Sequence, residues 1–384
     1  LLRKKSIWIY RMLQSKFSHS LTLFQKIKNY DFILLMSIFI LGVISIFTMY
    51  STDGGEILFH TKSHFVKFLI FFPMMIILSF INIKYWHAGS YLFYLIILGL
   101  LVWVSLYGVK ASGSKRWIDL YFLNLQPSEL MKIAVILCLA KFFHRIRSSN
   151  TNAFSSILIS LTIIIIPTIL VITQPDLGTS ILISFSGLII LWFSGLKIKY
   201  FVYSFLIFIT SLPFIISFLK PYQKLRILTF INPEKDPLGS GYQIIQSKIA
   251  VGSGGLTGKG FLKGTQSYLD FLPEKHTDFI FTLFSEEFGF VGSMLLLILY
   301  SIIIYRIIRA GLISRSFFSR LFCFGFSFAI FLYVATNMSM VLGLLPIVGS
   351  PLPIMSYGGS SLLATMIGFS IVLSAGINHN QNIA

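Results

Sequence analysis

Residues 32–50 read FILLMSIFILGVISIFTMY, a run without one charged side chain. A helix of this length can cross the hydrocarbon core of a bilayer, which is roughly 30 Å thick. The run is also longer than the apolar centre of a cleavable signal peptide. The residues before it contain Lys and Arg but no acid, apart from Asp31 at its border. We therefore expect residues 1–30 to form a basic cytoplasmic segment and the first run to stay in the membrane as an anchor.

Similar apolar runs recur along the chain, about ten in all. Backbone polar groups inside a bilayer must be paired within the protein, so we expect each run to be a helix. The fold class is then an all-α polytopic membrane protein. The runs lie near residues 32–50, 65–81, 88–107, 126–143, 156–172, 178–193, 200–219, 279–305, 318–341 and 353–375.

The longest connection falls between spans 7 and 8. Spans 1–7 occupy residues 31–219, a large external loop occupies 220–277, spans 8–10 occupy 278–376, and 377–384 form a cytoplasmic tail. Apolar and aromatic residues recur through the loop, which favours short helices on the membrane surface over a disordered linker. No separate soluble domain and no internal repeat are evident.

Composition supports a membrane protein and argues against a nucleic-acid partner. The 384 residues are 55% hydrophobic and 11% charged, whereas about 25% of residues in a soluble domain are charged. The net charge is +18, but the basic residues gather in short connections that the span order places inside the cell, as the positive-inside rule requires. Cys138 and Cys323 lie within apolar runs, which argues against a disulfide or a cysteine metal site.

Polar residues at the external ends of the spans are candidates for function, because ionisable groups in a membrane are costly unless paired or hydrated. Glu129 follows Pro127 in the first turn of span 4, and Lys132 lies on the same face. This pair could orient the bundle or bind substrate, and residue types alone leave both open. Asp176 is in a Gln-Pro-Asp-Leu-Gly turn, where turn chemistry favours a helix cap over a binding role.

Two loops offer further candidates. Arg116 could hold a phosphate, and residue type alone leaves this role open. Trp117 could contact a sugar or lipid face, but residue type favours an ordinary anchor at the membrane interface. The glycine-rich residues 252–260 do not match a P-loop, which argues against an ATPase. Flexible turns are the favoured interpretation there, with a phosphate-binding backbone nest and Lys259 as the alternative.

The most informative motif is LPEKHTDFI, residues 272–280. An acid at the start of a long apolar helix is usually a cap. However, Asp278, Glu129, Lys132, Asp176 and Arg116 come from separate parts of the chain and share one external level in the expected topology. Together they can bind a charged substrate.

Deeper in the same span, Glu286 and Glu287 cannot both face lipid, so at least one should face a cavity or pair with a cation. The run 356–361, SYGGSS, together with nearby prolines, breaks the last span at its external end.

These motifs resemble the SEDS (shape, elongation, division, sporulation) family of cell-wall polymerases, and within it the RodA type. The resemblance extends from the first span to Ser360. Its most specific stretches are residues 232–239 (NPEKDPLG), 242–247 (YQIIQS), 264–267 (GTQS) and 273–279 (PEKHTDF). No motif position departs from the family pattern.

The resemblance implies a peptidoglycan glycosyltransferase that polymerises lipid II into β-1,4 glycan during cell elongation, at the outer face of the bacterial inner membrane. It implies Asp278 as the general base of an inverting displacement. The implied partners are lipid II, a class B penicillin-binding protein transpeptidase, the elongation machinery and membrane lipids. The substrate-binding candidates are Arg116, Trp117, Glu129, Lys132, Asp176, Lys259, His276, Thr277 and Ser356.

A divalent cation, Mg or Mn, is a candidate cofactor, although the sequence shows no dedicated metal cage. Two other functions fit the charged spans: a flippase that moves lipid II between leaflets, and a non-catalytic scaffold that positions a transpeptidase.

Overall fold

The computed structural model of the chain describes residues 22–111, 114–120, 124–146, 150–218, 224, 228–235, 240–265 and 274–383. The predictions for residues 1–21 and for the motif residues 236–239 and 266–273 lie outside this part of the chain. A short helix, α2 (Leu23–Lys28), is capped by Thr22 and precedes the bundle.

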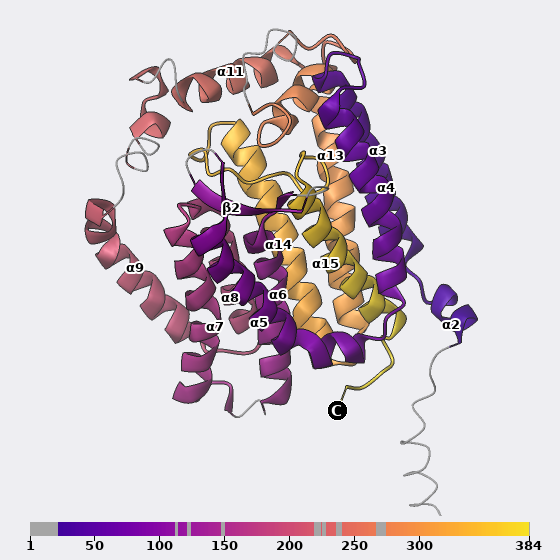
Figure 1. Ribbon diagram of the computed structural model, residues 1–384, viewed down its shortest axis with the longest axis vertical. Coiled ribbons are helices and arrows are strands. Elements are labelled where there is room, and N and C mark those ends of the chain that lie inside the picture. The colour runs from indigo at the N-terminus through magenta and orange to yellow at the C-terminus, as the bar shows by residue number, and fades with distance from the viewer. Residues whose placement is uncertain are drawn as a thin grey trace, which may run out of the picture.

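Within the described residues, a long helix occupies each of the ten ranges expected to span a membrane (Figure 1). Seven of them are long and apolar enough to do so: α3, α4, α5, α7, α13, α14 and α15. The ten helices are α3 (Phe32–Thr52), α4 (Phe59–Ser79), α5 (Ile83–Tyr107), α6 (Pro127–Arg145), α7 (Phe154–Thr173), α8 (Leu177–Phe193), α9 (Ile198–Phe218), α13 (Ile280–Ile313), α14 (Phe317–Val341) and α15 (Gly359–Ile377).

The helix boundaries differ from the expected ranges where polar residues or prolines flank an apolar run. Helix α4 begins at Phe59 rather than near residue 65, because its first turns contain His60, Lys62 and His64 and therefore escape a hydropathy window. Helix α15 begins at Gly359 rather than at 353. Proline lacks an N–H, and Ile354 has a positive φ of 67°, so a helix cannot run through this segment.

Helix α6 is the central helix of the bundle. Almost every side chain between Pro127 and Phe143 is buried, including those of Glu129, Lys132 and Lys141. A helix that is buried all round lies inside the protein rather than against lipid. This position explains why α6 tolerates charged residues that an outer helix could not hold.

The outer helices show the opposite pattern. Leu69 and Ile77 of α4 and Leu95 and Trp103 of α5 are each more than half exposed. Exposed apolar patches of this extent do not occur on ordinary water-soluble monomers and fit a lipid-facing surface.

A small antiparallel sheet connects α5 to α6. Its strands are β1 (Val109–Ala111), β2 (Ser114–Asp119) and β3 (Asn124–Leu125), in the order β1-β2-β3. Val109 pairs with Trp117 and Ile118 pairs with Leu125. Figure 1 shows β2 lying across one end of the helices, near the start of α15. The sequence predicts only a loop here, so the sheet is a difference between prediction and structure.

The described residues of the long connection between α9 and α13 include two helical elements. Its elements are the 3-10 turn η2 (Pro233–Lys235) and helix α11 (Ser240–Ser253). In Figure 1, α11 lies above the same end of the bundle as β2. The residues after α11 are held by hydrogen bonds from Lys259 N to Glu286 O and from Gly260 N to Glu287 O, both 3.0 Å.

Helix α13 has a kink at the point where the residues after α11 bond to it. Gly289 has φ 63° and ψ −161°, which interrupts the helix. A Cβ at Gly289 would lie 2.3 Å from Gly258 N, so only glycine allows the two backbones to approach this closely. The kink therefore anchors the end of the long connection to α13.

Polar contacts also join helices at the opposite end of the bundle. Arg306 of α13 binds the Asp31 carboxylate with Nη2–Oδ1 and Nε–Oδ2 distances of 2.7 and 2.9 Å. Asp31 also caps α3 by accepting from Leu34 N. Asn29 donates to Ile377 O at the end of α15.

Candidate active site

A polar cavity of about 430 Å³ lies at the end of the bundle that β2 covers. Residues from β2, the start of α6, the α7–α8 turn, the turn before α13 and the segment before α15 line it. Six of the sequence-predicted site residues are among them: Arg116, Trp117, Glu129, Asp176, Thr277 and Asp278. The expected convergence of these distant segments is thus present in the structure.

Asp278 lies at the end of a tight turn that precedes α13. Thr277 N and Phe279 N both donate to Glu274 O, at 3.2 and 3.3 Å, and Asn337 Nδ2 donates to Asp278 O at 2.8 Å. The main chain of Asp278 is therefore held from both sides. Its carboxylate lies by the cavity wall, since a Cβ built on Gly349, another lining residue, would lie 3.5 Å from Asp278 Oδ2.

Asp176 combines two roles that the sequence left as alternatives. Its Oδ1 accepts from Thr179 N at 3.2 Å and so caps α8. Its Oδ2 accepts from Gln126 Nε2 at 3.0 Å and lies 3.9 Å from Arg116 Nη1. The side chain is only 7% exposed, yet it lines the cavity. The contacts with Thr179, Gln126 and Arg116 therefore fix the position of the Asp176 carboxylate in the cavity wall.

Arg116 is oriented by the main chain of the α7–α8 turn. Its Nε donates to Gln174 O at 2.9 Å, and its Nη2 donates to Pro175 O. These two bonds fix the planar guanidinium beside the α7–α8 turn, and Arg116 remains one of the residues that line the cavity. Trp117, the next residue of β2, also lines the cavity.

Glu129 and Lys132 form the intrahelical ion pair that their spacing allows, with an Nζ–Oε1 distance of 2.8 Å. Tyr333 OH donates to Glu129 Oε2 at 3.1 Å, and Lys132 Nζ lies 4.2 Å from the centre of the Tyr333 ring. Both charged side chains are almost fully buried. Glu129 reaches the cavity wall, whereas Lys132 is beneath it and is not a lining residue.

Lys259 lies outside the cavity. Its Nζ binds Glu286 Oε1 at 2.6 Å, and Thr265 donates to the same oxygen from both N and Oγ1. This ion pair confirms the prediction that at least one of Glu286 and Glu287 faces a cavity or pairs with a cation. Lys259 thereby connects the segment after α11 to α13. Neither Glu286 nor Thr265, the partners in these bonds, is a lining residue of the polar cavity.

Ser356 and His276 also lie outside the lining. Ser356 Oγ accepts from Leu352 N at 2.7 Å, which closes a buried turn before α15. His276 lies on the other side of its turn, where its Nε2 is 2.8 Å from Asp53 Oδ1. Its main-chain oxygen accepts from Tyr357 N at 2.8 Å.

Several lining residues were not among the predicted site residues. Gln126 orients Asp176, and its N–H donates to Ser360 Oγ at 2.8 Å. Ser360 in turn donates to Asn124 O, so it joins the end of β3 to the start of α15. The Gln-Pro-Ser-Glu and Tyr-Gly-Gly-Ser motifs contained both residues, but sequence spacing could not show that they meet.

Among the described residues, one group of three side chains could hold a metal ion: Asp53, His60 and His276, whose donor atoms all lie within 4.8 Å of one another. Burial, followed by repulsion from His60, lowers the pKa of His276. Burial would raise the pKa of Asp53, but hydrogen bonds from Thr61 and His276 outweigh it and lower that pKa below its usual value. These residues are not part of the cavity lining.

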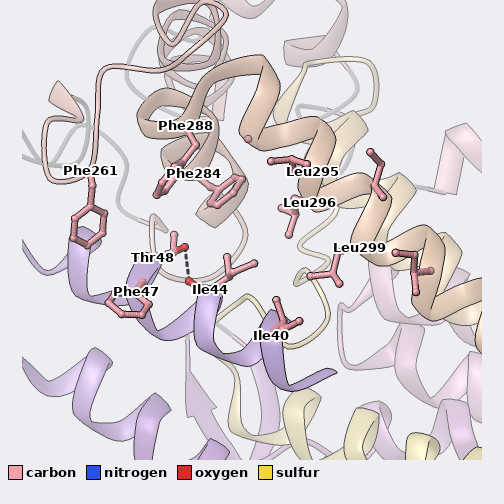
Figure 2. Close-up of a pocket in the computed structure, with 13 residues that line it drawn as sticks. Ile40, Ile44, Phe47, Thr48, Phe261, Phe284, Phe288, Leu295, Leu296 and Leu299 are labelled. Atoms are coloured by element: carbon pink, nitrogen blue, oxygen red, sulfur yellow. Dashed lines mark hydrogen bonds between the residues drawn. The ribbon is translucent and has the colours of Figure 1, made fainter. Parts of the chain in front are cut away.

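A second cavity, of about 600 Å³, lies between α3 and α13 and is almost entirely apolar. Figure 2 shows Ile40, Ile44 and Phe47 of α3 facing Leu295, Leu296 and Leu299 of α13. Among the described residues that line it, Thr48 carries the one hydroxyl, and its Oγ1 donates to Ile44 O of the same helix at 2.8 Å. These described residues offer no group for acid–base chemistry, so the polar cavity is the candidate active site.

The fold and the site define an integral membrane protein of many helices, with an acid-lined cavity at one end of the bundle. Comparison with known families shows which family this protein belongs to. Residues 28–381 match the FtsW/RodA/SpoVE family, described as cell cycle protein, and the chain belongs to this family.

Relatives agree with this membership. The chain is 44% identical over 302 residues to "Peptidoglycan glycosyltransferase MrdB" of Escherichia coli K12, covering 78% of this chain and 81% of that protein. It is 38% identical over 336 residues to "Probable peptidoglycan glycosyltransferase FtsW" of Buchnera aphidicola, subspecies Schizaphis graminum, covering 85% and 94%. MrdB is of the RodA type, and its higher identity supports that assignment.

Solved structures show the same fold. A chain from the structure described as "Structural coordination of polymerization and crosslinking by a peptidoglycan synthase complex" superposes with a TM-score of 0.77 at 29% identity, covering 92% of this chain and 99% of that one. The rod shape determining protein RodA of Thermus thermophilus superposes with a TM-score of 0.69 at 25% identity, covering 92% and 98%.

Proposed function

We propose that this chain is a peptidoglycan glycosyltransferase of the RodA type, which polymerises lipid II into β-1,4 glycan strands during cell elongation. The observation that carries this proposal is the position of Asp278 in an acid-lined cavity in a member of this family. The names of the relatives support the same activity.

The reaction joins two lipid-linked saccharides by a single displacement with inversion. The 4-hydroxyl oxygen of one saccharide forms a bond to the anomeric carbon of the other, and the bond from that carbon to the diphosphate oxygen breaks. The Asp278 carboxylate accepts the hydroxyl proton as the new bond forms. Its neighbours suit this task, because Asn337 and the turn hold the main chain in place and leave the carboxylate at the wall.

The leaving prenyl diphosphate gathers negative charge, which a nearby cation should stabilise. Among the described lining residues, Arg116 is the single basic side chain. Lys132, the other cation considered from the sequence, is paired with Glu129 below the wall. We therefore assign charge stabilisation to Arg116 and a structural role beneath the wall to Lys132.

We propose that a divalent cation, Mg or Mn, enters the cavity bound to the diphosphate of the substrate. Among the described residues, the one group of three metal-ligating side chains lies outside the lining of this cavity. The displacement is therefore derived from side chains alone. The excess of acids over bases in the wall would favour a diphosphate that arrives with its own cation.

The proposed setting is the bacterial inner membrane, with the N-terminus in the cytoplasm and the cavity on the external face. Basic residues near the opposite end of the bundle, such as Lys84, Arg145 and Arg306, support this orientation by the positive-inside rule. Glycan strands must be crosslinked by a transpeptidase, so we propose a class B penicillin-binding protein as the partner. The peptidoglycan synthase complex that shares this fold, in which polymerisation and crosslinking are coordinated, supports such a pairing.

The test uses the purified full-length chain with its transpeptidase partner and lipid II. Wild type should form glycan strands, and Asp278→Ala should lose this activity by about 10²–10⁴-fold, the usual contribution of a general base. Glu274→Gln is the matched control, because it neutralises an exposed carboxylate of the same cavity and should keep most activity. A fully active Asp278→Ala variant would exclude the mechanism.

The flippase and scaffold alternatives give different results in the same preparation. Movement of lipid II between the leaflets of proteoliposomes, with no polymer formed by wild type, would favour a transporter. Growth supported by Asp278→Asn with partner binding intact would favour a scaffold. Strand formation that depends on Asp278 excludes both as the sole function.

A further inference from the structure

We propose that Asp53, His60 and His276 form a binding site for one transition-metal ion of the Zn²⁺ class, outside the polar cavity. Nothing in the proposed glycosyl transfer uses these three side chains. The metal-binding proposal therefore goes beyond that function and can fail or succeed independently of it.

The first argument is the geometry of the three donor atoms. Asp53 Oδ1 lies 2.8 Å from His276 Nε2 and 3.7 Å from His60 Nδ1, and the donor atoms all lie within 4.8 Å of one another. A tetrahedral Zn²⁺ with bonds of 2.0–2.1 Å separates its ligands by about 3.4 Å. Small rotations of the two imidazoles would therefore admit an ion, with a water molecule as the fourth ligand.

The second argument is the support around Asp53. Thr61 donates to Asp53 Oδ2 from its main-chain N at 3.0 Å and from its hydroxyl at 2.6 Å. Both bonds use the oxygen that does not face the histidines. They fix the carboxylate and leave Oδ1 directed at the imidazoles, as outer hydrogen bonds do in metal sites.

The third argument is the arrangement of the two imidazoles. The rings of His60 and His276 are stacked with centroids 4.0 Å apart and an interplanar angle of 17°. Each ring presents one nitrogen to the same carboxylate oxygen, since His60 Nδ1 and His276 Nε2 both lie near Asp53 Oδ1. The two nitrogens and the oxygen therefore enclose a single point at which one ion could be held.

The choice of metal follows from the donor types. Two nitrogens and one carboxylate suit Zn²⁺ and its neighbours in the first transition series, whereas Mg²⁺ and Ca²⁺ prefer oxygen ligands alone. The side chain of His60 is 40% exposed, so an ion can enter from solvent. Cys138 and Cys323 are buried and cannot compete for it.

A bound ion would join three separate parts of the chain. Asp53 follows α3, His60 is in the first turn of α4, and His276 is in the turn that carries Asp278. His276 O also holds Tyr357 N of the cavity wall. The ion would therefore stabilise the rim of the active site without touching substrate.

The test measures metal binding directly, with no lipid II present. The full-length chain is purified in detergent, any polyhistidine tag is removed, and Co²⁺ is titrated as a spectroscopic probe before Zn²⁺ is added in competition. We expect one equivalent of Co²⁺ with visible ligand-field bands that Zn²⁺ abolishes. We also expect Zn²⁺ to raise the melting temperature.

Three variants make the result specific. His60→Ala should bind Co²⁺ at least about 100-fold more weakly and lose the thermal shift, while Thr61→Val should bind about tenfold more weakly, because it loses only an outer hydrogen bond. His379→Ala is the matched control, since His379 is far from the site in sequence and bonds within its own turn, and it should behave as wild type.

Two outcomes would overturn the proposal: no Co²⁺ bound by wild type, or equal binding by wild type and His60→Ala. In either case the three residues would form a proton-bound hydrogen-bond network only. Because His60 is partly exposed, His60→Ala should fold normally. Equal melting temperatures of His60→Ala and wild type in the presence of a chelator would verify this. If His60→Ala does not fold, Thr61→Val tests the same site.

Discussion

Asn337 Nδ2 donates to the main-chain oxygen of Asp278 at 2.8 Å and to that of Ser350 at 2.7 Å. The amide of one buried α14 residue thus connects the turn before α13 to the segment before α15. Both segments line the cavity, and Gly349 lies next to the Asp278 carboxylate. The position of the proposed base therefore depends on a side chain that does not itself reach the substrate.

We expect Asn337→Leu to lower kcat by about 100-fold with a much smaller change in KM. The substitution keeps the approximate size of the side chain but removes both donors, so Asp278 can shift, and misplacement of a reacting group by about 1 Å costs about this factor. The rate of glycan strand formation measures the effect, and a melting curve confirms that the variant folds.

Thr336→Val is the matched control for Asn337→Leu. It changes the neighbouring residue of α14, whose hydroxyl bonds to Leu332 O and Ser350 Oγ and not to Asp278. It should retain activity within about twofold, because no reacting group is displaced. Equal activity of both variants would show that Asn337 does not position the base.

Arg116 should contribute more to the departure of the diphosphate than to substrate affinity. Removing one group that stabilises transition-state charge usually lowers kcat by about 10²–10³-fold, and we expect this loss for Arg116→Gln. Arg116→Lys should be intermediate, because it keeps the charge but not the two bonds to the α7–α8 turn.

Lys115→Gln is the control for Arg116, as it removes the preceding charge of the same strand. Lys115 Nζ donates to Leu106 O and is not a lining residue, so activity should be close to wild type. If Lys115→Gln and Arg116→Gln were equally impaired, a general effect of positive charge would replace the specific role of Arg116.

The sequence predicted the helices well, because apolar runs and the need for internal backbone pairing determine them locally. It also identified Asp278, Asp176, Glu129 and Arg116, since acids and bases at span ends stand out against apolar neighbours. The structure adds that these four line one cavity.

Contacts between distant segments could not be predicted from spacing. Lys259 pairs with Glu286, 27 positions later, and Ser360 bonds to the start of α6, more than two hundred positions earlier. The small sheet that carries Arg116 was also missed, because β1 and β3 have only three and two residues and β2, SKRWID, does not alternate apolar and polar side chains. Asn337 lies in an apolar helix, where a lone amide gives no signal of its partner.

The buried pair of Glu129 and Lys132 should show strong coupling in unfolding experiments. Lys132→Met leaves a buried carboxylate without its cation, and breaking such a pair costs about 3–5 kcal/mol. The double variant Glu129→Gln, Lys132→Met removes both charges and should be more stable than Lys132→Met alone. Unfolding of detergent-solubilised wild type, both single variants and the double variant gives the four free energies of the cycle, and strictly additive effects would contradict an ion pair.

The last prediction concerns Gly178 in the first turn of α8. A Cβ at this position would lie 2.1 Å from Val348 O, so Gly178→Ala must displace the segment that forms the cavity wall next to Asp278. Overpacking of this kind costs about 1–3 kcal/mol, and the displaced wall should also lower polymerisation.

Gly89→Ala provides the comparison for Gly178→Ala, because Gly89 is also in an early turn of its helix, α5, but has open space around its position. Alanine is preferred over glycine in a helix by about 0.5–1 kcal/mol, so Gly89→Ala should be neutral or slightly stabilising and fully active. Melting curves and strand formation on both variants decide the matter. If Gly178→Ala matched Gly89→Ala in both measurements, α8 would not pack against the cavity wall as closely as this structure requires.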